Sequence, residues 1–376
     1  MNDATRWWIA GAVLGLCLAF GILIGTRTDD ATLTAHLQVQ QFSEDAAGPD
    51  AIRMQLEAAG FVDVPENVAR TLSTLAKVSD YPVYTMHYVG PYVRASELQV
   101  VPATDSEAAL LGTDWACSLF AAVGDAAQAT FGRNFDWEYS PLLVLFLEPE
   151  DGYRSIMSID IAYLIGEALI HDLDAAPADG LLPLLSAPFL TFDGMNEKGV
   201  AIGMASVDYE CGYPSDPDKR DVGDLRLMRE VLEASATVDE ALTFLEGINP
   251  VSQGGPNTHY LVADRTSAAL IEYHDGEMAV FRSSADEPWQ LGTNFPVGRT
   301  DGDPLGHCWR YDRIQTTLRE NSGVLSVAEA AGLLEAVSTS MTQWSIVYDL
   351  AALEMHLVIE RDAEHSLTFS LKEDAE

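Results

Sequence analysis

The hydrophobic pattern divides the chain into an apolar N-terminal run, a helix-prone region and a longer region dominated by strands. Within residues 29–81, apolar side chains at three-and-four spacing, such as Ile52 and Leu56, predict amphipathic helices at residues 31–42, 50–59 and 65–78. From residue 82 onward, apolar or alternating runs bounded by turn residues predict strands. Strands are expected at residues 82–89, 119–123, 142–147, 154–159, 342–349, 355–360 and 366–372, and three more are expected between residues 258 and 282.

Four helices are expected within the strand-rich region, packed over a sheet. The first keeps Leu227 and Val231 on one face, and the second begins at a capping signature formed by Thr237 and Glu240. The four helices are predicted at residues 225–234, 237–245, 308–320 and 326–337.

Residues 162–190 interrupt the strand pattern with helix-prone and loop residues and three prolines. Long irregular insertions often build binding walls or lids. The leucines between residues 181 and 190 suit an apolar pocket, and a buried core segment explains them equally well.

The N-terminal apolar run, residues 7–25, contains 19 uncharged residues. About 20 such residues cross a bilayer as a helix, and Trp7 and Trp8 stand where aromatic side chains favour the membrane interface. A cleavable signal peptide is the alternative, although its apolar core usually has only about 7–15 residues. The pattern favours an uncleaved anchor in residues 1–28 with the rest of the chain outside the cytoplasm, or a secreted protein if the segment is removed.

The charge of the chain excludes polyanions as partners. Among 376 residues, 58 are acidic and 21 are lysine or arginine, which gives a net charge of −37. Such a chain repels nucleic acid and anionic lipid headgroups. An acidic extracytoplasmic protein is expected, and adaptation to high salt is an alternative explanation.

The four cysteines, Cys17, Cys117, Cys211 and Cys308, do not follow a metal-binding spacing. A glycine-rich phosphate loop is also missing, so neither a metal nor an organic cofactor is expected. A disulfide between Cys211 and Cys308 is possible outside the cytoplasm, but two reduced cysteines are the simpler expectation.

The candidate chemistry lies in residues 114–137, DWACSLFAAVGDAAQATFGRNFDW. Two strand-like runs joined by a turn predict a hairpin, in which Arg133 and Asp136 would face Cys117 across the ladder. A nearby cation lowers the pKa of a cysteine from about 8.5, and the thiolate is the nucleophile.

This stretch offers no obvious base beside the thiol. Cleavage between Ala116 and Cys117 would supply one, because a free α-amine titrates near 7.7–8.0, roughly the pH at which a general base works. An N-terminal nucleophile activated by its own amine is an established arrangement. A papain-like pair of Cys117 with His259 is the alternative, but no Cys–His signature surrounds Cys117.

The same stretch resembles the nucleophile hairpin of the choloylglycine hydrolase and linear-amide C–N hydrolase family. Its members include bile-salt hydrolase, penicillin V acylase, acid ceramidase and isopenicillin N acyltransferase. Arg133 lies 16 residues and Asp136 lies 19 residues after Cys117, which matches the family pattern.

Further motifs resemble the family in the same order. FDGMNEKGVAIGMASVD, residues 192–208, is expected to form a tight hairpin with Asn-Glu-Lys-Gly at the bend. In it, Ser206 stands where bile-salt hydrolases have an asparagine whose backbone helps to stabilise the oxyanion. A serine at this position fits the acid ceramidase-like branch of the family better than it fits the bile-salt hydrolases. In WQLGTNFP, the resemblance places the Asn294 amide at the oxyanion, and in CWRYDRI it places Arg310 near the nucleophile, with Arg313 as the alternative. TQWSIVYD, residues 342–349, resembles the family's C-terminal strand.

The resemblance spans residues 114–360 and implies an α+β fold, the four-layer αββα sandwich of N-terminal-nucleophile hydrolases, preceded by a transmembrane helix and a helical N-terminal segment. It also implies that the Cys117 thiol attacks the Ala116 carbonyl, which frees the Cys117 amine for catalysis. Asp136 would orient that amine and Arg133 would favour the thiolate. The catalytic set implied is Cys117, Arg133, Asp136, Asn294 and Arg310, with a backbone donor at Ser206.

The implied organisation is an anchor at residues 1–28, a propeptide or light-subunit segment at residues 29–116 and a catalytic domain at residues 117–376. A separate small domain or stalk is the alternative for residues 29–116. The light and heavy fragments are expected to stay associated after cleavage.

The expected reaction is hydrolysis of a linear amide, and the anchor and the apolar insertion favour a lipid-like N-acyl amide. An acyltransferase that uses the same acyl-cysteine intermediate is one alternative. A catalytically inactive, membrane-tethered binding protein is another.

Overall fold

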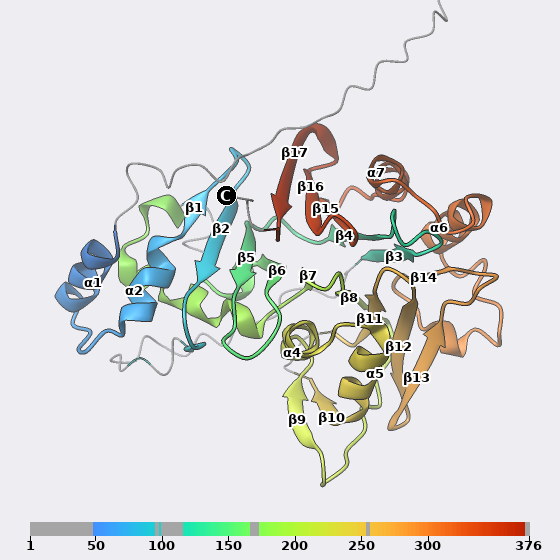
Figure 1. Ribbon diagram of the computed structural model, residues 1–376, viewed down its shortest axis with the longest axis horizontal. Helices are drawn as coiled ribbons and strands as arrows, with labels where there is room; N and C mark the ends of the chain where they lie inside the picture. The colour runs from blue at the N-terminus through green and yellow to red at the C-terminus, as the bar shows by residue number, and fades with distance from the viewer. Residues whose placement is uncertain (1–47, 95–97, 99–115, 166–172, 253–255, 373–376) are drawn as a thin grey trace, which may run out of the picture. The chain divides into compact units, whose positions relative to one another are not determined.

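The larger of the two main β-sheets includes strands from both sides of Cys117 (Figure 1). The computed structural model describes residues 48–94, 98, 116–165, 173–252 and 256–372. β2 and β5 pair in parallel from Val83–Leu142 to Tyr88–Leu147, and the other neighbours in this sheet are antiparallel. In spatial order the strands are β1 (Ala76–Lys77), β2 (Val83–Tyr88), β5 (Leu142–Leu147), β6 (Ser155–Asp160), β7 (Asp193–Asn196), β8 (Ala201–Ser206), β11 (Thr258–Ala263), β12 (Ala268–His274) and β13 (Glu277–Arg282).

The smaller sheet contains the predicted hairpin. β3 pairs antiparallel with β4, with Leu119 opposite Arg133, and β4 also pairs with β15. Every residue of β4 is buried, because the strand has neighbours on both edges and packs against a helix on one face. In spatial order the strands are β14 (Trp289–Gly292), β3 (Ser118–Ala122), β4 (Thr130–Asp136), β15 (Thr342–Asp349), β16 (Glu354–Ile359) and β17 (Asp362–Ser370).

The two sheets pack face to face, and helices cover their outer faces (Figure 1). β3 and β14 of the smaller sheet contact β8 and β11 of the larger. The helices α4 (Arg226–Ala234) and α5 (Val238–Glu246) pack on the larger sheet, and α6 (Trp309–Glu320) and α7 (Val327–Ala336) pack on the smaller. The predicted helices are confirmed in this mixed α/β fold, and so is the cap at Thr237, whose side chain accepts from the Glu240 backbone N–H.

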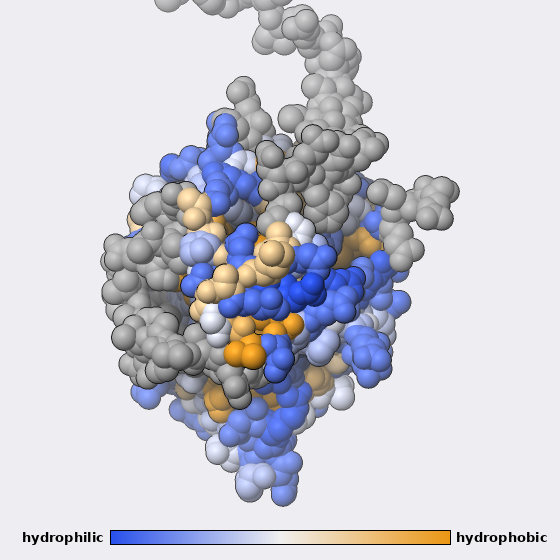
Figure 2. Space-filling model, turned by 90° about the vertical axis from the view of Figure 1, so that its left-hand side faces the viewer, coloured by the Kyte–Doolittle hydropathy of each residue, from blue (hydrophilic) through white to orange (hydrophobic). Residues whose placement is uncertain are grey.

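The described residues upstream of Cys117 do not form a separate domain. Besides β1 and β2 they form α1 (Pro49–Ala58) and α2 (Glu66–Ser73), which pack against η4 (Ala178–Phe189) of the downstream chain. The helix predicted up to residue 78 ends earlier, because residues 76–77 pair with β2. The side of the molecule that carries α1 is mostly hydrophilic, with small separated hydrophobic areas (Figure 2).

The predicted anchor at residues 7–25 and the helix expected at residues 31–42 lie outside the described residues. Within the ranges that the structure describes, no helix has both the length and the apolar character needed to cross a membrane.

The insertion at residues 162–190 forms short 3₁₀ helices, where described: η3 (Leu173–Ala175) and η4, following η2 (Ile161–Tyr163). Pro183 and Pro188 lie inside η4 and lack the N–H that an α-helix would need. The η4 leucines, Leu181, Leu182, Leu184 and Leu185, are buried in the main core. The core explanation of these leucines is therefore confirmed.

The sequence did not indicate a small parallel pair formed by β9 (Arg220–Gly223) and β10 (Ile248–Val251). Cys117, Cys211 and Cys308 are free thiols, so the expected reduced state of Cys211 and Cys308 is confirmed.

Gly132 tests how tightly the hairpin is packed. A Cβ at residue 132 would lie 2.5 Å from Phe120 Cε1, whereas a Cβ at Gly332 in α7 would meet nothing within 4 Å. We expect Gly132→Ala to lower the free energy of unfolding by about 1–3 kcal/mol, the usual cost of overpacking. The control Gly332→Ala should leave it unchanged or raise it by up to about 1 kcal/mol, because alanine favours helix. Urea unfolding checks both, and equal stabilities would contradict the close packing of Phe120 on Gly132.

Candidate active site

Cys117 lies directly before β3, buried beside the second strand of the hairpin. Because Ser118 pairs with Asn134, the side chain of Arg133 reaches back across the ladder toward the thiol. Arg133 Nη2 lies 3.8 Å from Cys117 Sγ. The predicted approach of Arg133 to Cys117 is therefore confirmed.

Arg133 is fully buried and joins the two sheets. Its guanidinium forms an ion pair with Asp193 on β7 of the larger sheet. Tyr348 on β15 donates its hydroxyl hydrogen to Asp193 Oδ1 over 2.5 Å. Sequence reasoning gave no role to Asp193 or Tyr348, although both lie inside motifs that carried the resemblance.

The β7–β8 hairpin positions Asp193 through its tight bend. Asn196 Oδ1 accepts hydrogen bonds from the backbone N–H groups of Lys198 and Val200, both at 3.0 Å. Gly199 has φ +79°, a conformation that residues with a Cβ rarely adopt. The hairpin predicted around Asn-Glu-Lys-Gly is confirmed.

The thiol of Cys117 is held protonated in the uncut chain. Burial raises the pKa of Cys117, and Arg133 only partly offsets this effect. The guanidinium also faces Asp193, which neutralises much of its charge. The expected lowering of the pKa by Arg133 is thus outweighed while the chain is intact.

Asp136 presents one carboxylate oxygen that lacks a hydrogen bond. Oδ1 accepts from Thr342 Oγ1 at 2.5 Å, whereas Oδ2 is buried with no hydrogen-bond partner among the described residues. Arg310 Nη1 lies 3.6 Å from Oδ2. Burial raises the pKa of Asp136 to about 6, although Thr342 and Arg310 favour the ionised form.

The residue before the proposed cut lies against the same strand. The Ala116 N–H donates to the Asp136 carbonyl oxygen over 3.3 Å. The backbone of Ala116 is therefore bonded to the backbone of Asp136, the last residue of β4.

Arg310 connects the nucleophile to the candidate oxyanion residue. From the first turn of α6, its Nη1 donates to the Cys117 carbonyl oxygen at 2.6 Å and to Ser118 Oγ at 2.9 Å. Its Nη2 donates to Asn294 Oδ1 at 2.7 Å. Arg313 is exposed, so Arg310 is the arginine that the fold brings to the site.

Asn294 bridges from Arg310 to the end of β8. Its Nδ2 donates to the Ser206 carbonyl oxygen at 2.8 Å and lies 2.9 Å from Ser206 Oγ. The structure therefore gathers all six residues expected at the site. A donor role for the Ser206 backbone N–H stays a prediction.

His259 serves a different part of the fold. Its Nδ1 lies 3.2 Å from Glu272 Oε1, and its ring is buried on β11. A Cys–His pair thus receives no support from the contacts of His259. Among the residues that the structure describes, no group of three or more histidine, cysteine or acidic side chains could hold a metal ion.

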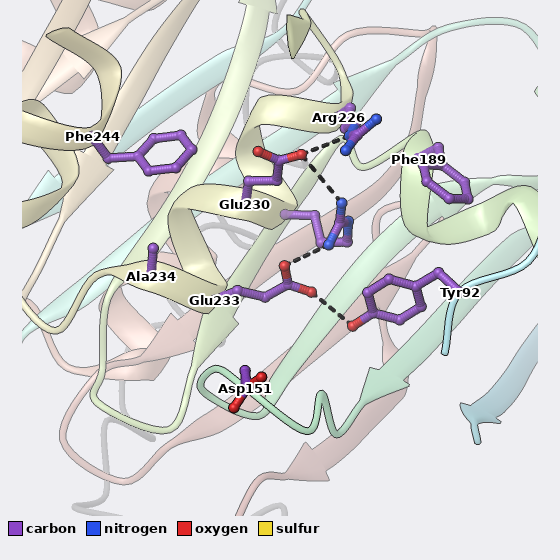
Figure 3. Close-up of a pocket in the computed structure, with 9 residues that line it drawn as sticks. Tyr92, Asp151, Phe189, Arg226, Glu230, Glu233, Ala234 and Phe244 are labelled. Atoms are coloured by element: carbon purple, nitrogen blue, oxygen red, sulfur yellow. Dashed lines mark hydrogen bonds and ion pairs between the residues drawn. The ribbon is translucent and has the colours of Figure 1, made fainter. Parts of the chain in front are cut away.

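A cavity of about 520 Å³ beside α4 is lined by none of these six residues (Figure 3). The charged side chains that α4 contributes to it are paired: Arg229 Nη1 with Glu233 Oε2 at 2.5 Å, and Arg226 Nε with Glu230 Oε1 at 2.6 Å. Tyr92, from the chain upstream of Cys117, donates its hydroxyl hydrogen to Glu233 Oε1 at 2.7 Å. The cavity therefore marks a contact between the upstream and downstream parts.

Replacement of Asp193 tests the ion pair that joins the sheets. Asp193→Asn keeps the shape but leaves the Arg133 charge buried without a counterion, which typically costs about 3–5 kcal/mol. The matched variant Tyr348→Phe removes one hydrogen bond to the carboxylate, worth about 1.5–3 kcal/mol. Urea unfolding should rank Asp193→Asn as the less stable variant. An Asp193→Asn protein at least as stable as Tyr348→Phe would contradict the role of the pair in joining the sheets.

Comparison with known proteins supports the motif resemblance. Residues 117–294 match the family of linear amide C–N hydrolases, choloylglycine hydrolase family. No curated protein sequence matches the chain.

Several solved structures resemble the chain at low sequence identity. A mutant of conjugated bile acid hydrolase from Clostridium perfringens is 17% identical, with 68% of this chain and 92% of that chain covered and a TM-score of 0.48. Penicillin V acylase from Agrobacterium tumefaciens is 18% identical, with 65% and 83% covered and a TM-score of 0.44. The Caenorhabditis elegans ortholog of N-acylethanolamine-hydrolyzing acid amidase is 14% identical, with 62% and 93% covered and a TM-score of 0.41. Over residues 117–294, beginning at Cys117, the chain is therefore similar in sequence to the linear amide C–N hydrolases of the choloylglycine hydrolase family.

Proposed function

We propose that the protein is an amidase of the N-terminal-nucleophile type, which frees Cys117 by cutting its own chain and then hydrolyses linear acyl amides. In this proposal the helix-covered pair of sheets is the αββα sandwich of such hydrolases. The observation that carries it is the convergence of Cys117 with Arg133, Arg310 and Asn294 through contacts of 2.6–3.8 Å. The sequence match of residues 117–294 to the linear amide C–N hydrolases supports the reaction class.

The open oxygen of Asp136 supports the self-cleavage step. A buried carboxylate oxygen without a donor is costly, and Oδ2 of Asp136 accepts no hydrogen bond from the residues that the structure describes. A new amine on Cys117 would bring N–H donors and positive charge next to this strand. Hydrolysis of the Ala116–Cys117 bond would therefore supply a donor that the described part of the uncut site lacks.

The self-cleavage requires only the chain and water. The Cys117 sulfur would attack the Ala116 carbonyl carbon, and the Cys117 nitrogen would leave and take up the thiol proton. Water would then hydrolyse the thioester, which leaves a carboxylate on Ala116 and a free amine and thiol on Cys117. Arg310 would hold the Cys117 backbone in place through the bond to its carbonyl oxygen.

In the cut enzyme the Cys117 amine would accept the thiol proton as the sulfur attacks the substrate amide. The amine component would leave with that proton, and water would release the acyl group as an acid. Arg310 donates to Asn294 Oδ1 and so fixes Nδ2 as the donor end of the amide. One N–H of Nδ2 would stay on the Ser206 carbonyl oxygen, and the other would turn from Ser206 Oγ to the oxyanion when substrate binds. Loss of one such donor typically lowers kcat by about 10²–10³.

We propose a lipid-like N-acyl amide as the substrate. The apolar run at residues 7–25, if it anchors the protein as predicted, would keep the site near membrane lipids. The leucines of the insertion no longer contribute to this argument, because they belong to the core. N-acyl amines with a series of acyl chain lengths test it: rates that rise with chain length support it, and a preference for the shortest acyl groups contradicts it.

We further propose that the fragment upstream of Cys117 stays bound after cleavage. Six residue pairs join β2 to β5 in parallel. Tyr92 is fixed to Glu233 at 2.7 Å, and Arg229 lies 4.7 Å from the centre of the Tyr92 ring (Figure 3). These contacts do not depend on the peptide bond at Ala116.

Replacement of Cys117 by alanine should abolish both self-cleavage and amide hydrolysis. The wild type should give a heavy fragment that begins at Cys117, separable from the light fragment in denaturant but not by native size-exclusion chromatography. N-terminal sequencing and mass spectrometry check this. Cys211→Ala, which changes another free thiol, should behave as the wild type. An active enzyme that stays uncut would refute the proposal.

Asp136→Asn should separate stability from function. Because burial raises the pKa of Asp136 to about 6, its charge destabilises the uncut chain at neutral pH. In a Cys117→Ala background we expect Asp136→Asn to raise the free energy of unfolding by about 1–3 kcal/mol at pH 7. The gain should fade as the pH falls through about 6 toward about 4, where the carboxyl is protonated in the folded chain and increasingly so in the unfolded chain.

With Cys117 present, Asp136→Asn should nevertheless prevent cleavage. Urea unfolding at neutral and acidic pH, together with gel analysis of cleavage, measures the two effects. A stability gain that is equal at both pH values would contradict the assignment of the penalty to the carboxylate charge.

A further inference from the structure

Glu272 on β12 lies almost fully buried beside the chain segment that follows Asn294. Four donor groups surround its carboxylate. Oε1 accepts from the Val297 N–H at 2.7 Å and faces His259 Nδ1 at 3.2 Å, and Oε2 accepts from the Gly298 N–H at 2.9 Å and faces His274 Nε2 at 2.8 Å.

These bonds fix one end of the short connection that carries Asn294. β14 ends at Gly292, and the 3₁₀ turn η5 (Val297–Arg299) begins five residues later. The other end is fixed by β14, because Gly292 pairs with Leu119 in the hairpin strand that follows Cys117. Asn294 is therefore held between the nucleophile strand and Glu272.

His259 extends the same anchor to β14. A Cβ on residue 292 would lie 3.0 Å from His259 Nε2. Only the absence of a side chain at Gly292 lets the imidazole lie against the strand just before Asn294. The ring thus contacts Glu272 on one side and β14 on the other.

His274 and Arg299 connect the segment to the loop after Ser206. Arg299 donates to the Tyr209 hydroxyl, to Asp275 Oδ2 at 2.9 Å and to His274 Nδ1 at 3.5 Å. Tyr209 follows Ser206 by three residues. One network therefore reaches both segments that meet at the Asn294 amide.

The carboxylate remains ionised in this buried place. Burial raises the pKa of Glu272, but the bonds from His259, Gly298 and His274 outweigh it, and the net pKa is below its ordinary value. An ionised carboxylate accepts all four donors, whereas a neutral amide in its place would turn an NH₂ group toward two of them.

We propose that Glu272 is a positioning residue for the oxyanion donor: by holding Val297 and Gly298 it fixes the Asn294 amide beside Cys117. The inference deepens the proposed function and rests on it. Glu272 acts through Asn294 and makes no contact with the nucleophile itself among the interactions of the described residues.

The test is a double-mutant cycle on the cut enzyme with an N-acyl amine substrate. Glu272→Gln should lower kcat about tenfold or more with little change in KM, because a misplaced donor weakens the transition state more than the ground state. In an Asn294→Ala background the same change should cost less than about twofold further, since residues that act through one another are not additive. Glu277→Gln, which removes an exposed carboxylate from the adjacent strand, should match the wild type.

Hydrogen exchange gives a readout that does not depend on activity. Amides of residues 293–299 should exchange faster in Glu272→Gln than in Glu277→Gln, while exchange in β3 and β4 stays unchanged. Gly298→Ala disturbs the contact from the other side, because its Cβ would lie 3.0 Å from Glu272 Oε2. It should reproduce both effects, and it replaces Glu272→Gln if that variant does not fold.

The possible results separate the two proposals. The positioning role is overturned if Glu272→Gln keeps the wild-type kcat. It is also overturned if Glu272→Gln lowers kcat by the same factor whether residue 294 is asparagine or alanine. If the wild type has no amidase activity, the proposed function is overturned instead. Hydrogen exchange then decides whether Glu272 anchors the segment. Faster exchange at residues 293–299 in Glu272→Gln supports the anchoring, and unchanged exchange overturns it.

Discussion

The site depends on one buried charge pair that connects the two sheets. Arg133 on β4 of the smaller sheet meets Asp193 on β7 of the larger, and Tyr348 completes the set of partners. A guanidinium placed in a protein core needs a counterion, since breaking such a pair costs several kcal/mol. The pair therefore fixes how the sheets face one another at this point. It also sets the distance of 3.8 Å from the guanidinium to the Cys117 sulfur, so the packing of the sheets and the geometry at the nucleophile have the same cause.

Around that pair, the described residues of the intact chain satisfy most polar atoms of the site. Arg310 donates to the Cys117 carbonyl oxygen and to Asn294 Oδ1, and Thr342 donates to Asp136 Oδ1. Asp136 Oδ2 is buried and accepts no hydrogen bond from a described residue, and the burial of this carboxylate lowers stability at neutral pH. We infer that this penalty persists because a freed α-amine would relieve it. The upstream chain is also part of the larger sheet, because its strand β2 pairs with β5. A cut after Ala116 would leave this pairing intact.

The sequence predicted the site residues best where they lie close together in the chain. Cys117, Arg133 and Asp136 fall within one hairpin, and the strand period and turn composition placed them together. Asn294 and Arg310 came only from the family resemblance, because Arg310 contacts Cys117, and Asn294 contacts Ser206, across long stretches of sequence. Asp193, Thr342, Tyr348 and Glu272 received no role, since a single buried acidic or hydroxyl residue has no local pattern that names its partner. The insertion leucines illustrate the same limit: an apolar run fits a core and a pocket equally well, and only the packing of η4 on α1 and α2 decided between them.

The most direct measurement of the proposed mechanism is the location of the acyl group during turnover. The protein would be mixed with an activated acyl amide, quenched in acid within the first turnovers, digested and sequenced by tandem mass spectrometry. The mechanism predicts a thioester mass on a peptide whose first residue is Cys117, with an unmodified α-amine. An acyl group on another side chain, or on Cys117 while it is still joined to Ala116, would contradict it.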